Sequence, residues 1–189
     1  MTMACSIFLS LALIFMQGCR EHEIVYPLNE EELITTVTLT FAKLDEQGIP
    51  TGESSTFSWR DEDGSGDPEI DEIVLSAHTQ YSLSLEILDE SKTPPEDITS
   101  EIRAEGEEHQ FFFSVQGTEL AITYDDSDEG GQPIGLSSQA TTEEGGTGSL
   151  TVVLRHQPDK NAEGVENGEI ANAGGDTDIE AIFQLTVAP

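Results

Sequence analysis

The residues with the clearest chemical pattern lie between Asp61 and Glu72, in a stretch rich in Asp, Glu and Gly. Counted from Asp61, oxygen-bearing side chains stand at positions 1, 3, 5, 7 and 9, glycine at position 6 and glutamate at position 12. A Ca²⁺ ion takes about six to eight oxygen ligands, and the glycine lets the chain turn so that they converge. The spacing therefore indicates a candidate Ca²⁺ site, whose ligands would be Asp61, Asp63, Ser65, Asp67 and Glu72.

Two features of this stretch differ from an EF-hand. The preceding residues 56–60 alternate as in a β-strand, whereas an EF-hand loop follows a helix. Pro68, at position 8, has no backbone N–H to offer a partner loop. A calcium-binding loop between two strands is one interpretation. The other is a plain turn in which Asp side chains accept hydrogen bonds from nearby backbone N–H groups.

Two more acidic pairs repeat the Asp-x-Asp spacing near the ends of expected strands. They are Asp126 with Asp128 and Asp176 with Asp178. If the three acidic segments meet at one end of the domain, they form a rim that attracts cations. The alternative is a set of exposed carboxylates that keep the protein soluble.

The four histidines, His22, His78, His109 and His156, lie far apart in the sequence. A zinc or copper site would need two or three of them to converge with a carboxylate. His156 falls on the apolar face of its expected strand, so we expect it to border the core. His109 follows the expected helix, where a protonated imidazole suits the negative end of the helix dipole.

Composition and motifs exclude several functions. Lys and Arg number 7 against 38 Asp and Glu, which gives a net charge of −31. Such a chain cannot build the cationic face that binding to nucleic acid or to an anionic bilayer requires. The sequence also has no nucleophile elbow, no paired-histidine metalloprotease motif and no phosphate-binding loop. We therefore predict no nucleic-acid partner and no enzymatic activity.

The N-terminal residues indicate export. Residues 1–18 carry no charge, and their apolar run from Ile7 to Met16 is too short to span about 30 Å of hydrocarbon, which is typical of a signal peptide. The run ends in Met16-Gln17-Gly18-Cys19, which resembles the lipobox of bacterial lipoproteins. The resemblance implies cleavage before Cys19, lipidation of its thiol, and a tether over residues 19–31. An ordinary secretory peptide, a buried N-terminal segment and a disulfide between Cys5 and Cys19 are the alternatives.

Alternation of apolar and polar residues predicts an all-β fold for residues 32–189. Thr36–Phe41 and Tyr81–Ile87 alternate strictly, and the same period recurs in residues 55–60, 73–77, 110–115, 120–124, 134–140, 150–156 and 179–187. We expect about nine strands in a single antiparallel β-sandwich, Ig-like or jelly-roll-like, because turn signals separate the strands at short intervals. Thr93-Pro94-Pro95-Glu96 forms a capping box that predicts one short covering helix over about residues 94–108.

The stretches EEELITTVTLTF, PPEDITSEIRAEGEEHQFFF, LAITYDDSDEGGQPIGL and LTVVLRHQP resemble small lipoproteins of Bacteroidota. The resemblance implies an outer-membrane accessory protein, on either leaflet, encoded near TonB-dependent receptors and with such a receptor as partner. Some of these lipoproteins carry a label that refers to periplasmic binding folds. Those folds need repeated βαβ units, and the single expected helix argues against the label.

These observations lead to one hypothesis and two alternatives. The hypothesis is a lipid-anchored, non-enzymatic module that binds a ligand or a partner at the outer membrane, with Ca²⁺ as a candidate stabiliser of its acidic loops. The first alternative is a structural or adhesive surface protein. The second is a carbohydrate-active enzyme, which would need two carboxylates facing each other across a cleft.

Overall fold

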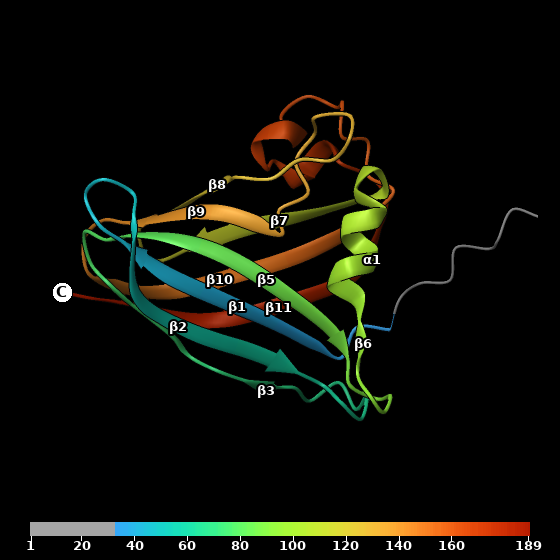
Figure 1. Ribbon diagram of the computed structural model, residues 1–189, viewed down its shortest axis with the longest axis horizontal. Helices are drawn as coiled ribbons and strands as arrows, with labels where there is room; N and C mark the ends of the chain where they lie inside the picture. Colours follow the sequence, from blue (N-terminus) through green and yellow to red (C-terminus); the bar gives the residue numbers. More distant parts are fainter. Residues whose placement is uncertain (1–32) are drawn as a thin grey trace, which may run out of the picture. The chain divides into compact units, whose positions relative to one another are not determined.

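The computed structural model describes residues 33–189, which form a sandwich of two β-sheets (Figure 1). The predicted signal peptide, Cys19 and the predicted tether of residues 19–31 lie outside the described residues. The strands are β1 (Thr36–Leu44), β2 (Pro50–Arg60), β3 (Glu69–Ile70), β4 (Ile73–Ser76), β5 (Gln80–Asp89), β6 (Glu96–Asp97), β7 (His109–Gln116), β8 (Leu120–Tyr124), β9 (Ser137–Thr142), β10 (Gly146–His156) and β11 (Asp176–Ala188). The helical elements are α1 (Ile98–Ala104) and the 3₁₀ turns η1 (Gly106–Glu108), η2 (Val165–Asn167) and η3 (Ile170–Asn172).

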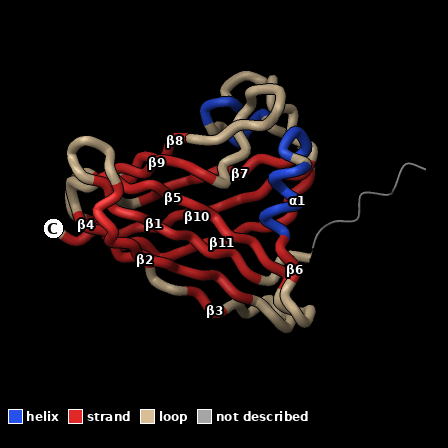
Figure 2. The backbone as a smooth tube through the Cα atoms, in the orientation of Figure 1, coloured by secondary structure: helices blue, strands red, loops and turns tan. Residues whose placement is uncertain are grey.

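The two sheets differ in size. The seven-stranded sheet has the order β3-β2-β1-β5-β9-β8, with β6 added beside β5, and the four-stranded sheet has the order β4-β11-β10-β7. Neighbouring strands are antiparallel, except that the short strand β4 runs parallel to β11. Figure 2 shows the strands of the two sheets as two red layers. The prediction of an all-β, antiparallel sandwich is confirmed.

The core lies between the sheets because each strand turns its apolar residues inward. Leu39 and Phe41 of β1 and Leu83 of β5 are fully buried, and Phe183 meets them from the four-stranded sheet. The Phe41 ring packs edge-on against the ring of Tyr81, with centroids 5.9 Å apart. Such pairs add to the stabilisation that comes from burying apolar area.

Each of the nine expected strands has a counterpart in the structure. The two strands that alternation did not predict, β3 and β6, have two residues each. A period of two cannot be recognised in so short a segment. Phe111 belongs to the main core, as expected of a strand residue, while Phe112 of the same strand faces the other way.

The predicted helix over residues 94–108 is wrong at both ends. Glu96 and Asp97 are extended and pair with β5, so the helix begins only at Ile98 and ends at Ala104. Asp97, and not Thr93, caps the helix, since its side chain accepts a hydrogen bond from the backbone N–H of Ser100 at 3.2 Å. Ile98 and Ile102 are buried and pack against the sandwich, so the helix covers it as expected.

Residues 157–175, which include η2 and η3, fold over part of the outer face of the four-stranded sheet. Val165 and Ala173 form a second apolar cluster with Phe112 and Val153 of that face. The backbone carbonyl of Val165 also accepts a hydrogen bond from the side chain of Gln110 at 2.9 Å. The remainder of this outer face stays open. Among residues 33–189, no helix is long and apolar enough to cross a membrane.

The cap at Asp97 gives a stability prediction. Asp97→Ala removes the acceptor for the first turn of α1, so we expect the free energy of unfolding to fall by about 1 kcal/mol. Thr93→Ala changes an exposed residue that does not cap the helix, so its effect should stay within about 0.5 kcal/mol. Urea titrations of both variants measure the two values, and an equal loss in both would contradict the assignment of the cap.

Candidate functional site

The acidic loop after β2 is built as a set of local turns. The Asp61 carboxylate accepts hydrogen bonds from the backbone N–H groups of Ser65 at 3.0 Å and Gly66 at 2.9 Å. The Asp63 carboxylate also accepts the N–H of Ser65, at 3.0 Å. Hydrogen bonding from the Ser65 side chain, together with this backbone bond, lowers the pKa of Asp63. The backbone N–H of Asp67 donates a hydrogen bond to the Ser65 hydroxyl at 3.3 Å. The loop therefore has the turn geometry that the sequence offered as one interpretation.

The fifth candidate calcium ligand points elsewhere. Asp61, Asp63, Ser65 and Asp67 line a small hollow of about 430 Å³ together with the side chain of Arg60. Glu72 lies outside this hollow, where its carboxylate accepts a hydrogen bond from the Thr186 hydroxyl at 2.8 Å. The Arg60 guanidinium donates a hydrogen bond to the Ser58 hydroxyl at 3.0 Å. The calcium site stays a prediction.

Asp126 and Asp128 hold the loop between β8 and β9. Asp126 accepts the backbone N–H groups of Gly135 at 2.7 Å and Ser137 at 2.9 Å. Asp128 forms a buried ion pair with Lys160, with Nζ and Oδ2 2.9 Å apart. Lys160 also donates to the carbonyls of Gly106 and Pro133. Three segments that are distant in the sequence are thus joined through one ammonium group.

Burial and pairing act in opposite directions on each group of this pair, and the pKa of both groups is lowered. Burial acts to raise the pKa of Asp128, but the bonds from Lys160 and from the N–H of Gln132 outweigh it and hold the pKa below its ordinary value of 3.8. Burial lowers the pKa of Lys160 from 10.5, although Asp128 opposes that change. The ion pair therefore fixes the segment of residues 158–164 against the loop that contains Asp128.

The three acidic segments do not share one site. Residues 61–72 follow β2 and residues 125–136 follow β8, and strands β1, β5 and β9 lie between β2 and β8. Four strand spacings separate them by about 19 Å. Asp176 and Asp178 belong to the other sheet, where Asp176 is exposed and Asp178 turns inward. Each segment therefore has its own surroundings.

An open hollow of about 830 Å³ lies on the outer face of the four-stranded sheet. It combines exposed apolar side chains with amide, hydroxyl and carboxylate groups. Gly148 brings β10 close to the end of β7, because a Cβ at this position would lie 1.9 Å from the carbonyl oxygen of Gln116. The residues that line the hollow are Ile70, Asp71, Glu72, Gln116, Gly117, Thr147, Gly148, Ser149, Ile182, Gln184, Leu185 and Thr186.

Strand register explains how the polar groups of the hollow converge. Ser149 pairs with Gln184 on one side and with Gln116 on the other, so the three side chains stand in one row across the sheet. Thr186 lies in the next row, beside Thr147. Sequence reasoning missed this hollow because a polar outer face of alternating strands gives no signal until the register is known.

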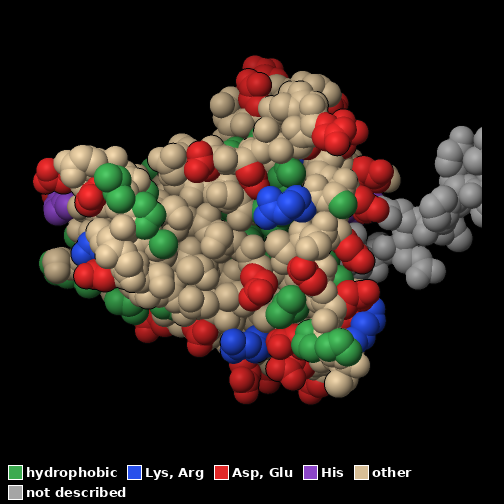
Figure 3. Space-filling model, in the orientation of Figure 1, with side chains coloured by type: hydrophobic (Ala, Val, Ile, Leu, Met, Phe, Trp, Pro, Cys, Tyr) green, Lys and Arg blue, Asp and Glu red, His purple; other side chains and the backbone are tan. Residues whose placement is uncertain are grey.

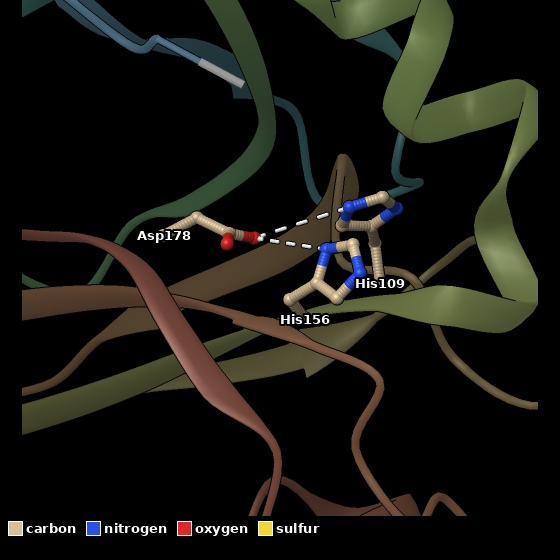
Figure 4. Close-up of side chains that lie close together, drawn as sticks. All are labelled: His109, His156 and Asp178. Atoms are coloured by element: carbon tan, nitrogen blue, oxygen red, sulfur yellow. Dashed lines mark ion pairs between the residues drawn. The ribbon is translucent and has the colours of Figure 1, made fainter. Parts of the chain in front are cut away.

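A compact cluster of different chemistry lies on the inner face of the same sheet. His109 begins β7 and His156 ends β10, and the two residues pair directly across the strands. Their rings are nearly perpendicular, with centroids 4.8 Å apart. Asp178 of β11 lies beside both, with its Oδ2 3.9 Å from His109 Nε2 and 3.8 Å from His156 Nδ1 (Figure 4). The side chains of His109, Asp178 and His156 are 0%, 1% and 11% exposed.

A β-bulge directs Asp178 into this cluster. Leu154 pairs with Ile179 and Arg155 pairs with Thr177, so Asp178 is the extra residue between two ladder positions. A bulge re-aims the side chain that it inserts. Strict alternation from Ile179 back along β11 would place Asp178 on the outer face. The sequence therefore predicted a loop carboxylate where the structure has a buried one.

Among the described residues, these three form the one group of His, Cys, Asp or Glu side chains close enough to hold a metal ion, with candidate ligand atoms within 4.8 Å of one another. Two of the four histidines thus converge with a carboxylate, as a transition-metal site requires. His78 is exposed and distant, and His22 lies outside the part of the chain that the structure describes.

Comparisons of the chain with protein-family models, with curated proteins and with solved structures each found no match.

The acidic loop gives a prediction that separates its two interpretations. Because Asp61 and Asp63 already accept backbone N–H groups and Arg60 lines the hollow, we expect Ca²⁺ and Mg²⁺ at matched ionic strength to raise the Tm equally, by screening. Thermal melts in EDTA, Ca²⁺ and Mg²⁺ measure this. A rise of several degrees with Ca²⁺ alone would instead establish a calcium site, if Asp61→Ala with Asp63→Ala abolishes it. Asp45→Ala, which removes an equivalent turn acceptor, is the matched control.

Proposed function

We propose that the protein is a lipid-anchored, non-enzymatic binding module of the outer membrane, and that its ligand occupies the hollow on the outer face of the four-stranded sheet. This hollow is the observation that carries the proposal. It is concave and joins the apolar side chains of Ile70 and Ile182 to a larger set of polar groups that converge on the same sheet face. An outer-membrane receptor is the partner that the resemblance to Bacteroidota lipoproteins suggests.

The lining indicates the class of ligand. Ile70 and Ile182 are exposed and offer apolar contact, while Gln116 and Gln184 offer both donors and acceptors. Asp71 and Glu72 make the hollow unfavourable for an anion. A neutral or cationic ligand with both apolar and hydrogen-bonding surface fits these groups best.

The two carboxylates of the hollow support a role in binding. Asp71 accepts the backbone N–H of Ser58 at 2.8 Å, and Glu72 accepts the Thr186 hydroxyl at 2.8 Å. They are neighbours in the chain, and each is held by a hydrogen bond. A glycosidase needs two carboxyl groups that face each other from opposite sides of the bond it cleaves, whereas Asp71 and Glu72 are adjacent in the chain.

A second candidate function, adhesion, is favoured by the outer face of the seven-stranded sheet. Rows of hydroxyl groups cross this face, including Thr38 with Ser58 and Thr40 with Thr56, whose oxygens are 3.3 and 3.4 Å apart. Figure 3 shows acidic side chains gathered around this face and a centre with few charges. A face of this kind, with few charges, suits contact with a large neutral surface.

The lipid anchor is tested by metabolic labelling of bacteria that express the full-length chain with an alkyne analogue of palmitate. We expect label on the natural chain and on Cys5→Ser, because Cys5 lies in the signal peptide. Cys19→Ser should carry no label, because it lacks the thiol that receives the lipid. An unlabelled natural chain, or label that persists in Cys19→Ser, would contradict the anchor.

The binding site is tested by NMR titration with a panel of neutral oligosaccharides and cationic peptides. We expect a saturating compound to shift the amide signals of Ser149, Ile182 and Gln184. Ile182→Glu should weaken that compound at least about tenfold, or 1.4 kcal/mol, because it puts a charge into the apolar contact. Thr40→Glu, on the opposite outer face, is the matched control. Shifts confined to the face around Thr40 would favour adhesion instead.

A further inference from the structure

We propose that His109, His156 and Asp178 form a binding site for a divalent transition-metal ion, with Zn²⁺ as the type case. The ligand atoms would be Nε2 of His109, Nδ1 of His156 and Oδ2 of Asp178. This site lies on the inner face of the four-stranded sheet, whereas the hollow lies on its outer face. The two proposals can therefore fail independently.

The distances suit a metal ion with small adjustments of the side chains. Zn²⁺ binds imidazole nitrogen and carboxylate oxygen at about 2.0 to 2.2 Å, so ligand atoms in a tetrahedral site stand about 3.3 to 3.5 Å apart. In the structure Oδ2 of Asp178 lies 3.9 Å from His109 Nε2 and 3.8 Å from His156 Nδ1. Contraction by about 0.5 Å around a central ion brings these two separations into the range of a zinc site. The two imidazole nitrogens, which lie within 4.8 Å of each other, must also move closer together.

The backbone holds all three ligands on rigid elements. His109 and His156 are a cross-strand pair of β7 and β10, and the bulge in β11 fixes the direction of Asp178. Gly174 and Gly175 precede β11 with positive φ angles of 60° and 67°. A Cβ on Gly175 would lie 2.2 Å from the carbonyl oxygen of His156, so glycine lets β11 start close beside this ligand. Sites on strands are held more precisely than sites on loops.

The end of helix α1 orients His109 for the proposed role. The Nδ1 atom of His109 lies 3.2 Å from the carbonyl oxygen of Glu105. A carbonyl only accepts, so Nδ1 carries the proton of this bond, and Nε2 is the nitrogen of His109 through which the ring would bind a metal ion. Metal-binding histidines usually donate their second nitrogen to a carbonyl or carboxylate in this way.

The ligand types identify the class of ion. Imidazole nitrogen suits Zn²⁺, Cu²⁺, Ni²⁺ and Fe²⁺, whereas Ca²⁺ and Mg²⁺ prefer sites made of oxygen. Two histidines and one carboxylate are the three protein ligands of several zinc sites that keep a further position for water or a bound molecule. The His156 side chain, which is 11% exposed, is the most exposed of the three ligands.

The experiment measures metal binding by the full-length protein after treatment with a chelator. Calorimetry with Zn²⁺ gives the stoichiometry, and Co²⁺ gives a visible spectrum that reports its ligands. We expect about one equivalent of Zn²⁺, as one three-ligand site predicts. His156→Gln and Asp178→Asn should each weaken binding at least about 100-fold, since loss of a supporting group alone costs 10- to 100-fold.

Three variants serve as matched controls. Asp176→Asn changes an exposed carboxylate two residues from Asp178, and His22→Gln and His78→Gln change the histidines outside the cluster. Retained binding in these controls, with the loss in His156→Gln and Asp178→Asn, supports the site. Thermal melts confirm that each variant is folded. Three results would overturn the proposal: the natural chain binds neither Zn²⁺ nor Co²⁺, binding persists without His156 and Asp178, or His22→Gln or His78→Gln abolishes binding.

Discussion

Burial of two apolar sheet faces against each other holds this fold together, because the charge of the molecule works against compaction. The chain carries a net charge of −31, and residues 33–189 contain no cysteine that could form a disulfide within them. Each fully buried Leu, Ile or Phe contributes about 1.5 to 3 kcal/mol toward offsetting the repulsion and the loss of chain entropy. The inner faces are therefore apolar along most of their length, and the carboxylates gather on loops and at the ends of the sheets.

Buried carboxylates in this protein form ion pairs or accept hydrogen bonds. Asp89 lies 3.3 Å from Lys92, and Asp128 lies 2.9 Å from Lys160. Removing either lysine would leave a carboxylate charge in a poorly solvated place, which is costly. Asp126 uses backbone N–H groups for the same purpose. The acidic composition thus serves the fold locally, because many Asp side chains close the turns that join the strands.

The sequence predicts the parts of this structure that depend on local periodicity. All nine strands were expected because one face of each packs on the core. The helix was misplaced because Glu96 and Asp97 pair with β5, a contact that no local capping pattern reveals. Asp178 was expected in a loop because a single bulge reverses the direction of a side chain without changing the composition of the strand. The burial of Lys160 depends on loops that meet only in the folded chain.

At one end of the inner face of the four-stranded sheet, the apolar core gives way to buried polar side chains. Leu154 and Phe111 form the last apolar pair of β10 and β7 on this face, and the next pair on the same face is His156 with His109. The Asp178 carboxylate lies 3.9 Å from His109 and 3.8 Å from His156. A divalent cation would balance it directly. The acidic surface would raise the local concentration of cations, and the two imidazoles would select a transition-metal ion over Ca²⁺ or Mg²⁺.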